Sequence, residues 1–253
     1  MSYDWNFSAV VSPDNIALLE SGAQMTVELS ALSIVIGTVL GVGLGALATV
    51  GSPSFAPLRP SIASTTKKRS TVFAALLTVV RFGALSFVDV VRSIPLLLTV
   101  LLSYYAMPIL FPAVDRTNVF LPCLLAFSLN LAAFVGELVR AGVVALPPGV
   151  ILAARSLGMT PRQTWWRIVL PQIIRDILPA QVVLCITIIK MTTLASAVSL
   201  YEILHSGENI IQRTYRPLEV YVLIGIFFVV FIVPLALIAR RLETTSVFRR
   251  REL

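Results

Sequence analysis

The sequence predicts an all-α integral membrane protein with five transmembrane helices in a single domain, residues 1–253. Apolar residues make up 57% of the chain and charged residues only 13%, about half of the roughly 25% found in soluble domains. Long uncharged runs recur along the chain, and no ten-residue alternation of a transmembrane strand is sustained. Membrane-spanning helices are therefore the expected elements.

Five runs are long enough to cross the hydrocarbon core, which takes about 20 mostly apolar residues in a helix. Three charged residues interrupt another apolar stretch, 71–92, so we expect an interfacial helix there that breaks at Pro95. Within the first run, Gly37, Gly41 and Gly45 are spaced to let another helix approach closely. The five expected spans cover residues 25–50, 93–114, 117–136, 177–201 and 220–239.

Basic residues predict the orientation, because cytoplasmic loops retain Lys and Arg. Sixteen of the 20 Lys and Arg residues follow the first or the third run or lie in the C-terminal tail. These segments are therefore expected in the cytoplasm, with the N-terminus outside and the C-terminus inside. The net charge of +7 does not indicate a nucleic acid partner, since long uncharged runs separate the basic residues.

The loop at residues 144–172 carries the most specific pattern in the chain. Pro147 and Pro148 should end one helix and begin another. Gly158 can cap that second helix in the left-handed conformation. The loop is therefore expected to hold a short cytoplasmic helix over residues 150–157.

A second helix should begin directly after this short one. Thr160 and Gln163 have the spacing of a capping box, and Pro171 is expected to end the helix. Trp165 and Trp166 lie in this stretch, and we interpret them as anchors at the membrane interface.

Several ordered motifs resemble those of ABC importer permeases of the polar amino acid family, the histidine and glutamine type. The run PPGVILAARSLGMTPRQTWWRIVLPQ resembles the family's EAA loop, and VRSIPLLLTV, GELVRAG and KMTTLASAVSLYEIL are similar to three further family segments. The resemblance extends over roughly residues 20–243. It implies the type I importer fold, with five spans in each of two paired subunits in the bacterial inner membrane.

The resemblance also implies partners and a coupling helix. The short helix would dock on a dimer of ABC ATPase subunits, while an extracytoplasmic solute-binding protein delivers a polar amino acid or related solute. A second copy or a homologous permease would pair with this chain. Leu152 stands where the family has Glu, which favours a homologous partner that supplies an intact loop. The implied docking residues are Pro148, Gly149, Val150, Leu152, Ala153, Ala154, Arg155, Leu157 and Gly158.

The residues indicate no catalytic or metal site. None of the three lysines follows a Gly as in a phosphate-binding loop, so ATP and Mg are expected in the partner ATPase and no cofactor in this chain. Cys123 and Cys185 lack partners at metal-ligand spacing. The single histidine, His205, is expected to be solvated in an external loop.

Charged residues inside or beside the spans are candidates for function. Lys190, with Thr192 and Thr193, either lines the solute path or has a structural role. Glu137 and Arg140 are spaced i, i+3, so they can pair with each other or brace the coupling loop, and we favour bracing.

Two other functions compete with import driven by ATP. An ion-coupled secondary transporter would usually show internal repeats around carboxylates at the membrane midplane, and no repeat is visible. A membrane enzyme or scaffold is disfavoured by the lack of a catalytic set.

Overall fold

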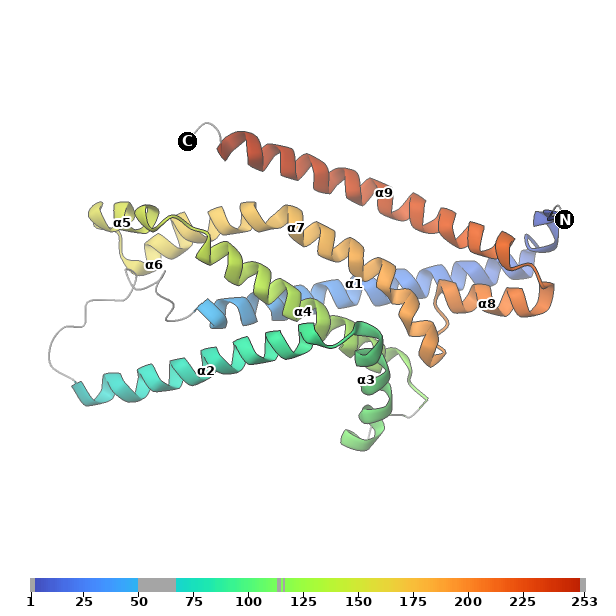
Figure 1. Cartoon of the computed structure of the whole chain (residues 1–253), viewed down its shortest axis with the longest axis horizontal. Helices are drawn as coiled ribbons and strands as arrows, with labels where there is room; N and C mark the ends of the chain where they lie inside the picture. The colour runs from blue at the N-terminus through green and yellow to red at the C-terminus, as the bar shows by residue number, and fades with distance from the viewer. Residues whose placement is uncertain (1–2, 50–66, 113–114, 116, 251–253) are drawn as a thin grey trace. The chain divides into compact units, whose positions relative to one another are not determined.

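The chain is almost entirely helical in the computed structural model, which describes residues 3–49, 67–112, 115 and 117–250 and shows no strand among them (Figure 1). Three single helices are apolar and long enough to cross a membrane: α1 (Pro13–Thr49), α4 (Phe120–Val144) and α9 (Pro217–Arg250). A fourth runs over Arg162–Val198 and contains α7 (Leu170–Met191). The predicted all-α membrane fold is confirmed.

The second expected span, 93–114, differs most from the structure. Two helices, α2 (Lys67–Ser93) and α3 (Leu96–Leu110), are separated there by a short break, and only together are they long and apolar enough to cross a membrane. α3 has 15 residues, which at 1.5 Å per residue is about 22 Å, shorter than a hydrocarbon core of about 30 Å. Pro95 lies in this break with ψ 135°, outside the helical region, so the predicted break is present. The predicted ends at Val50 and Val114 lie outside the described residues.

The expected external loop after the fourth span is instead a helix, α8 (Ile203–Thr214). Its low mean hydropathy hides it from a search for membrane spans. Burial of Ile203, Gly207 and Ile210 at helical spacing gives the helix one packed face. The packing of its apolar face against the rest of the unit therefore stabilises this helix.

The residues group into two compact units. The first comprises Met1–Ile36, Ile94–Leu129 and Cys185–Ile238. It has two clusters of buried apolar side chains. One is formed by Leu29, Val100, Cys123, Ala126, Phe127, Ala195, Val198 and Leu200, and the other by Val10, Ile203, Ile210, Val220 and Ile224.

The second unit comprises Gly37–Ser93, Asn130–Leu184 and Ala239–Leu253. Here α1 packs closely on α4 through its glycines. A Cβ atom added at Gly41 would lie 2.5 Å from Val135 Cβ and 2.8 Å from the Ala132 carbonyl oxygen. The predicted close approach at the glycine face is therefore confirmed.

Candidate functional site

The short helix expected in the loop is present as α5 (Pro148–Ser156) in the second unit. Pro147 is extended before it, with φ −60° and ψ 130°. Gly158 follows it with φ +74°, and its N–H donates to the Arg155 carbonyl at 2.9 Å. The Met159 N–H donates to the Ala154 carbonyl at 3.1 Å, which completes a Schellman cap. The predicted C-terminal cap is confirmed.

α5 has one buried and one exposed face. Ile151 and Ala154 are 2% and 4% exposed, and Ile151 belongs to the apolar cluster of this unit, with Val143, Leu146, Val169 and Ile173. Leu152 and Leu157 are 54% and 82% exposed, and Arg155 is also exposed. The helix is thus held to its own unit on one side and presents two leucines and an arginine on the other.

The predicted capping box is confirmed directly after α5. The Thr160 N–H donates to Gln163 Oε1 at 2.9 Å, and the Gln163 N–H donates to Thr160 Oγ1 at 3.3 Å. α6 (Pro161–Thr164) then continues without interruption through the π-helical segment η3 (Trp165–Val169) into α7.

The predicted helix end at Pro171 is wrong. In η3 the Leu170 N–H bonds to the Trp165 carbonyl, five residues back. This wider turn lies immediately before Pro171. A π-helical turn shifts the backbone hydrogen-bond pairing by one residue, so the helix can continue through a proline, which has no N–H to donate. Trp165 packs on the apolar cluster of the unit, whereas Trp166 is 59% exposed.

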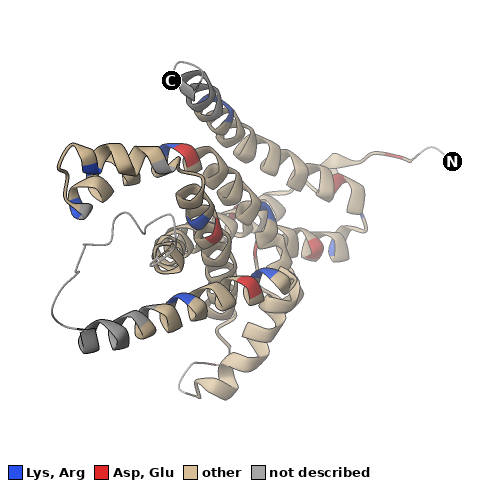
Figure 2. Ribbon diagram, turned by 60° about the vertical axis from the view of Figure 1, so that its left-hand side comes forward, with Lys and Arg blue, Asp and Glu red and all other residues tan. Residues whose placement is uncertain are grey.

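Basic residues lie along this helical loop (Figure 2). Arg155, Arg162, Arg167 and Arg175 are all exposed, and Asp176 is the acidic residue that follows them. The exposed surface of the loop therefore combines apolar leucines with positive charge, a combination suited to a partner surface with acidic groups.

Glu137 and Arg140 pair with each other within α4. Arg140 Nε and Nη2 donate to the two carboxylate oxygens of Glu137 at 2.7 and 2.6 Å. Two charges of α2 also interact electrostatically with this pair, Arg92 with Glu137 and Asp89 with Arg140. The pair therefore interacts with α2, and the expected bracing of the coupling loop stays a prediction.

The three candidates for the solute path lie at the junction of α7 and η4 (Thr192–Val198). Lys190 is exposed in the last turn of α7. Thr192 is fully buried, and its hydroxyl donates to the Ile189 carbonyl at 2.8 Å. The Thr193 hydroxyl donates to the Lys190 carbonyl at 3.0 Å. In this conformation Lys190 has the most accessible polar group of the three.

The burial of two carboxylates, Glu202 and Glu219, was not predicted from the sequence. Glu202 is fully buried at the start of α8, where its two oxygens accept the N–H groups of Leu204 and His205, each at 2.9 Å. Burial raises the pKa of Glu202 to about 7. An acidic N-cap before the amphipathic pattern of α8 is the signal that could have revealed it.

His205 lies in α8, so its prediction as a solvated loop residue is wrong. Its side chain is 19% exposed, and Nδ1 lies 3.6 Å from Glu208 Oε2. The imidazole ring also meets Tyr201 edge to face, with ring centroids 4.7 Å apart. Within the described residues, no three His, Cys, Asp or Glu side chains gather to hold a metal ion.

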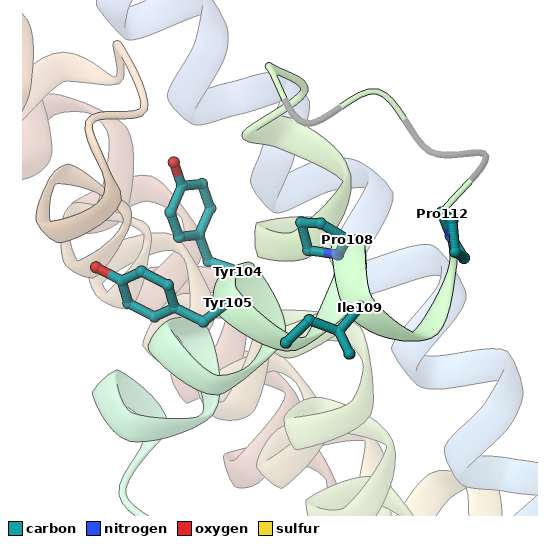
Figure 3. Close-up of a pocket in the computed structure, with 5 residues that line it drawn as sticks. All are labelled: Tyr104, Tyr105, Pro108, Ile109 and Pro112. Carbon is teal, nitrogen blue, oxygen red and sulfur yellow. The ribbon is translucent and has the colours of Figure 1, made fainter.

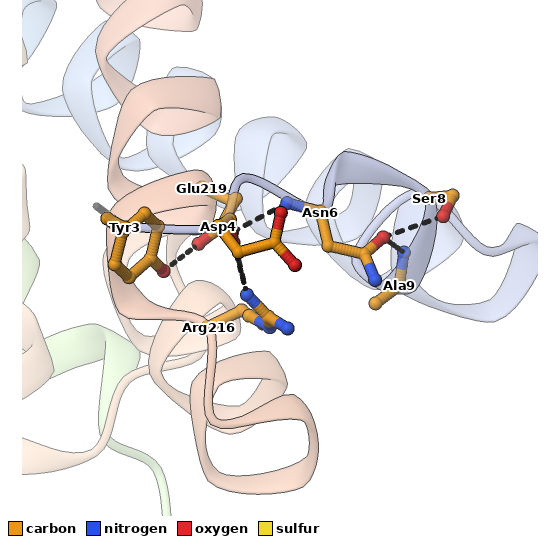
Figure 4. A network of polar contacts seen from close by, with 7 residues as sticks. All are labelled: Tyr3, Asp4, Asn6, Ser8, Ala9, Arg216 and Glu219. Atoms are coloured by element: carbon orange, nitrogen blue, oxygen red, sulfur yellow. Dashed lines mark hydrogen bonds and ion pairs between the residues drawn. The ribbon is translucent and has the colours of Figure 1, made fainter. Parts of the chain in front are cut away.

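Glu219, the second buried carboxylate, binds the N-terminal segment to the start of α9 (Figure 4). It accepts a hydrogen bond from the Tyr3 hydroxyl at 2.5 Å and another from the Asn6 N–H at 3.0 Å. Arg216 lies 3.5 Å from the carboxylate and donates to the Asp4 carbonyl at 2.6 Å. Tyr3 and Asn6 are 216 and 213 positions from Glu219, so no local pattern marks these two bonds.

An open hollow of about 600 Å³ lies along the end of α3 (Figure 3). Its lining offers two phenol groups and no charged side chain. A solute with an ammonium and a carboxylate group would find no charge partner here, so the hollow does not define a solute site. The lining residues are Tyr104, Tyr105, Pro108, Ile109 and Pro112.

Residues 70–246 match the family model described as the binding-protein-dependent transport system inner membrane component. The chain belongs to this family. It is 27% identical to the glutamine transport system permease protein GlnP of Escherichia coli (strain K12) over 243 residues, 96% of this chain and 97% of that protein. It is 32% identical to the octopine transport system permease protein OccM of Rhizobium meliloti over 223 residues, 83% of this chain and 78% of that protein.

A solved amino acid ABC transporter with histidines has a chain of the same fold, with a TM-score of 0.72, 26% identity and complete coverage of both chains. The predicted membership among permease subunits of ABC importers is confirmed. This permease is a multi-pass protein of the inner membrane, and its family works with ATPase and binding-protein partners. A secondary transporter and a membrane enzyme are no longer competing interpretations.

Proposed function

We propose that this permease moves a polar amino acid or a related solute by alternating access, driven by an ABC ATPase that docks on α5. The exposed face of α5 carries this proposal. Its buried residues Ile151 and Ala154 fix the helix to the second unit, so force applied at Leu152, Arg155 and Leu157 reaches the whole unit. ATP can shift the permease between its two states only through a contact that differs between them.

The names of the relatives support an amino acid or opine as solute, since GlnP is a glutamine permease and OccM an octopine permease. The test is uptake of labelled glutamine, arginine and octopine by liposomes that contain the permease, its ATPase and the solute-binding protein. We expect uptake that requires ATP inside the liposome. Uptake driven by an ion gradient without ATP would contradict the proposal.

Leu152 allows a direct test of docking. Burial of a leucine side chain contributes roughly 1.5–3 kcal/mol, and Leu152→Asp would replace it with a charge that has no assigned partner. We expect this variant to retain less ATPase during purification or to hydrolyse ATP without uptake. Leu152→Met, which preserves the apolar area, is the matched control and should behave like the parent. Normal docking and uptake in Leu152→Asp would show that α5 is not the docking element, and the helix that begins at Pro161 would then be the candidate.

The orientation belongs to the same proposal, with the N-terminus outside and the loop 144–172 and the C-terminus in the cytoplasm. Single cysteines at Ser156 of α5 and at Gln212 of α8 test it, because both positions are exposed. A membrane-impermeant thiol reagent added to intact cells should label position 212 and leave position 156 unlabelled. Labelling at position 156 and not at position 212 would show that the orientation is the opposite of the one proposed.

The partners complete the proposal. Leu152 in place of the family's Glu supports pairing with a homologous permease rather than a second copy. ATP and Mg would then bind only to the ATPase subunits. A tagged copy should therefore fail to co-purify an untagged copy of the same chain, whereas a tagged copy that retains the untagged one would show a homodimer. ATP hydrolysis by the pure permease would contradict the proposal that only the ATPase subunits bind nucleotide.

A further inference from the structure

Three aromatic side chains near the N-terminus form an exposed row, which we call the aromatic ladder: Tyr3, Trp5 and Phe7. They are 43%, 53% and 40% exposed. The rings of Tyr3 and Trp5 meet edge to face with centroids 5.2 Å apart, and those of Trp5 and Phe7 stack at 5.6 Å. The rings therefore contact one another in sequence, and all three remain accessible.

The aromatic ladder is attached to the first turn of α9 (Figure 4). Tyr3 and the Asn6 backbone bond to the buried carboxylate of Glu219, and the Asp4 carbonyl accepts from Arg216. Immediately after the ladder, Val10 is fully buried in an apolar cluster of the first unit. The ladder is thus held at both of its ends.

Membrane helices begin on both sides of these attachments. α1 starts at Pro13 and α9 at Pro217, and both are long and apolar enough to cross a membrane. Exposed apolar side chains continue from the ladder into each helix, at Val11 and Ile16 on the α1 side and Leu218 on the α9 side. The expected span of α9, residues 220–239, begins three residues after the start of that helix, so the attachment places the ladder where α9 meets the membrane surface. The expected span of α1 begins farther along its helix, at residue 25.

We propose that the aromatic ladder is a lipid-binding surface that seats the N-terminal segment in the headgroup region of the bilayer. Tyr and Trp rings favour this region because they combine an apolar ring with a polar edge. Arg216 and Glu219 bond within the attachment, so the three rings supply the exposed apolar surface of the segment, beside the exposed Asp4. A run of exposed rings suits lipid better than a charged protein partner. Because Glu219 belongs to α9, the ladder also fixes the depth at which α9 enters the bilayer.

Tryptophan fluorescence tests the proposal, since the chain has three Trp residues. Trp165→Phe combined with Trp166→Phe leaves Trp5 as the only reporter. The full permease is placed in nanodiscs made with either ordinary or brominated phosphatidylcholine, and the tryptophans of the ATPase, the solute-binding protein and the nanodisc scaffold protein are replaced by phenylalanine. We expect blue-shifted Trp5 emission, loss of most of it in brominated lipid, and little quenching by acrylamide from water.

The matched control moves the reporter by three residues. In the same background, Trp5→Phe with Ser8→Trp places the indole at an exposed position outside the ladder. This reporter should be quenched by acrylamide and much less by brominated lipid. Equal lipid quenching at positions 5 and 8 would overturn the assignment of lipid binding to the ladder.

A protein partner gives a different result. If Trp5 is quenched by acrylamide in nanodiscs and becomes shielded only when a solute-binding protein is added, the ladder is a docking surface for that protein and the proposal is wrong. A red-shifted emission insensitive to lipid bromine would equally refute it. Monodisperse elution of each variant with its ATPase establishes that the reporters sit in folded permease.

Discussion

Replacing Gly41 by leucine tests the packing of α1 on α4. A Cβ at this position would lie 2.5 Å from Val135 Cβ and 2.8 Å from a backbone oxygen of Ala132, and neither neighbour is the flexible end of a side chain. Overpacking of this kind reaches about 3 kcal/mol, offset by about 1 kcal/mol from the better helix propensity of leucine. The expected net loss is about 2 kcal/mol, or roughly 4–8 °C in Tm.

Gly43 provides the matched control, because it lies on the same helix and a Cβ there would meet nothing within 4 Å. Gly43→Leu should therefore keep or raise the Tm. Unfolding can be followed with a thiol-reactive dye, since Cys123 is buried and Cys185 half-buried in the folded protein. Equal melting temperatures for the Gly41→Leu and Gly43→Leu variants would refute the close packing of α1 and α4.

Three further predictions concern single residues. Burial raises the pKa of Glu202 from an ordinary 4.5 to about 7, so the folded chain retains a proton that the unfolded chain has released. Stability should fall as pH rises from about 4.5 to about 7, and Glu202→Gln should remove this slope from a Tm series. Gly158→Ala forces a left-handed conformation on alanine and should cost about 1 kcal/mol of stability, which would reduce ATPase retention. Gly149→Ala should not lower the stability, because the backbone of Gly149 does not have a positive φ. Lys190→Met should impair uptake; full uptake with unchanged specificity would leave only a structural role for the lysine.

The local features of the loop could be predicted from the sequence because each depends on residues within one or two turns. The cap of α5 consists of backbone bonds from Gly158 to Arg155, three positions earlier, and from Met159 to Ala154, five positions earlier. Thr160 bonds to Gln163, three positions later. Such short-range geometry follows from residue type and spacing. The family membership was predictable for the same reason, since its motifs are short and ordered.

Features that depend on distant residues or on packing were not predictable. Tyr3 and Glu219 are 216 positions apart, so nothing near either residue marks the bond. α8 is too polar to stand out by hydropathy, and burial of one face stabilises it. The end predicted at Pro171 failed because a π-helical turn before the proline preserves the helix.

The central claim, that α5 is the contact with the ATPase, is tested most directly by cross-linking. A cysteine at Leu157, which is 82% exposed, is introduced into a chain whose native cysteines are replaced by serine. We predict that a short bifunctional thiol reagent links it to the ATPase in native membranes and that the yield changes when ATP is added. A cysteine at the buried Ala154 should give no link. ATPase cross-links from Arg162 or Trp166 together with none from Leu157 or Leu152 would contradict the account.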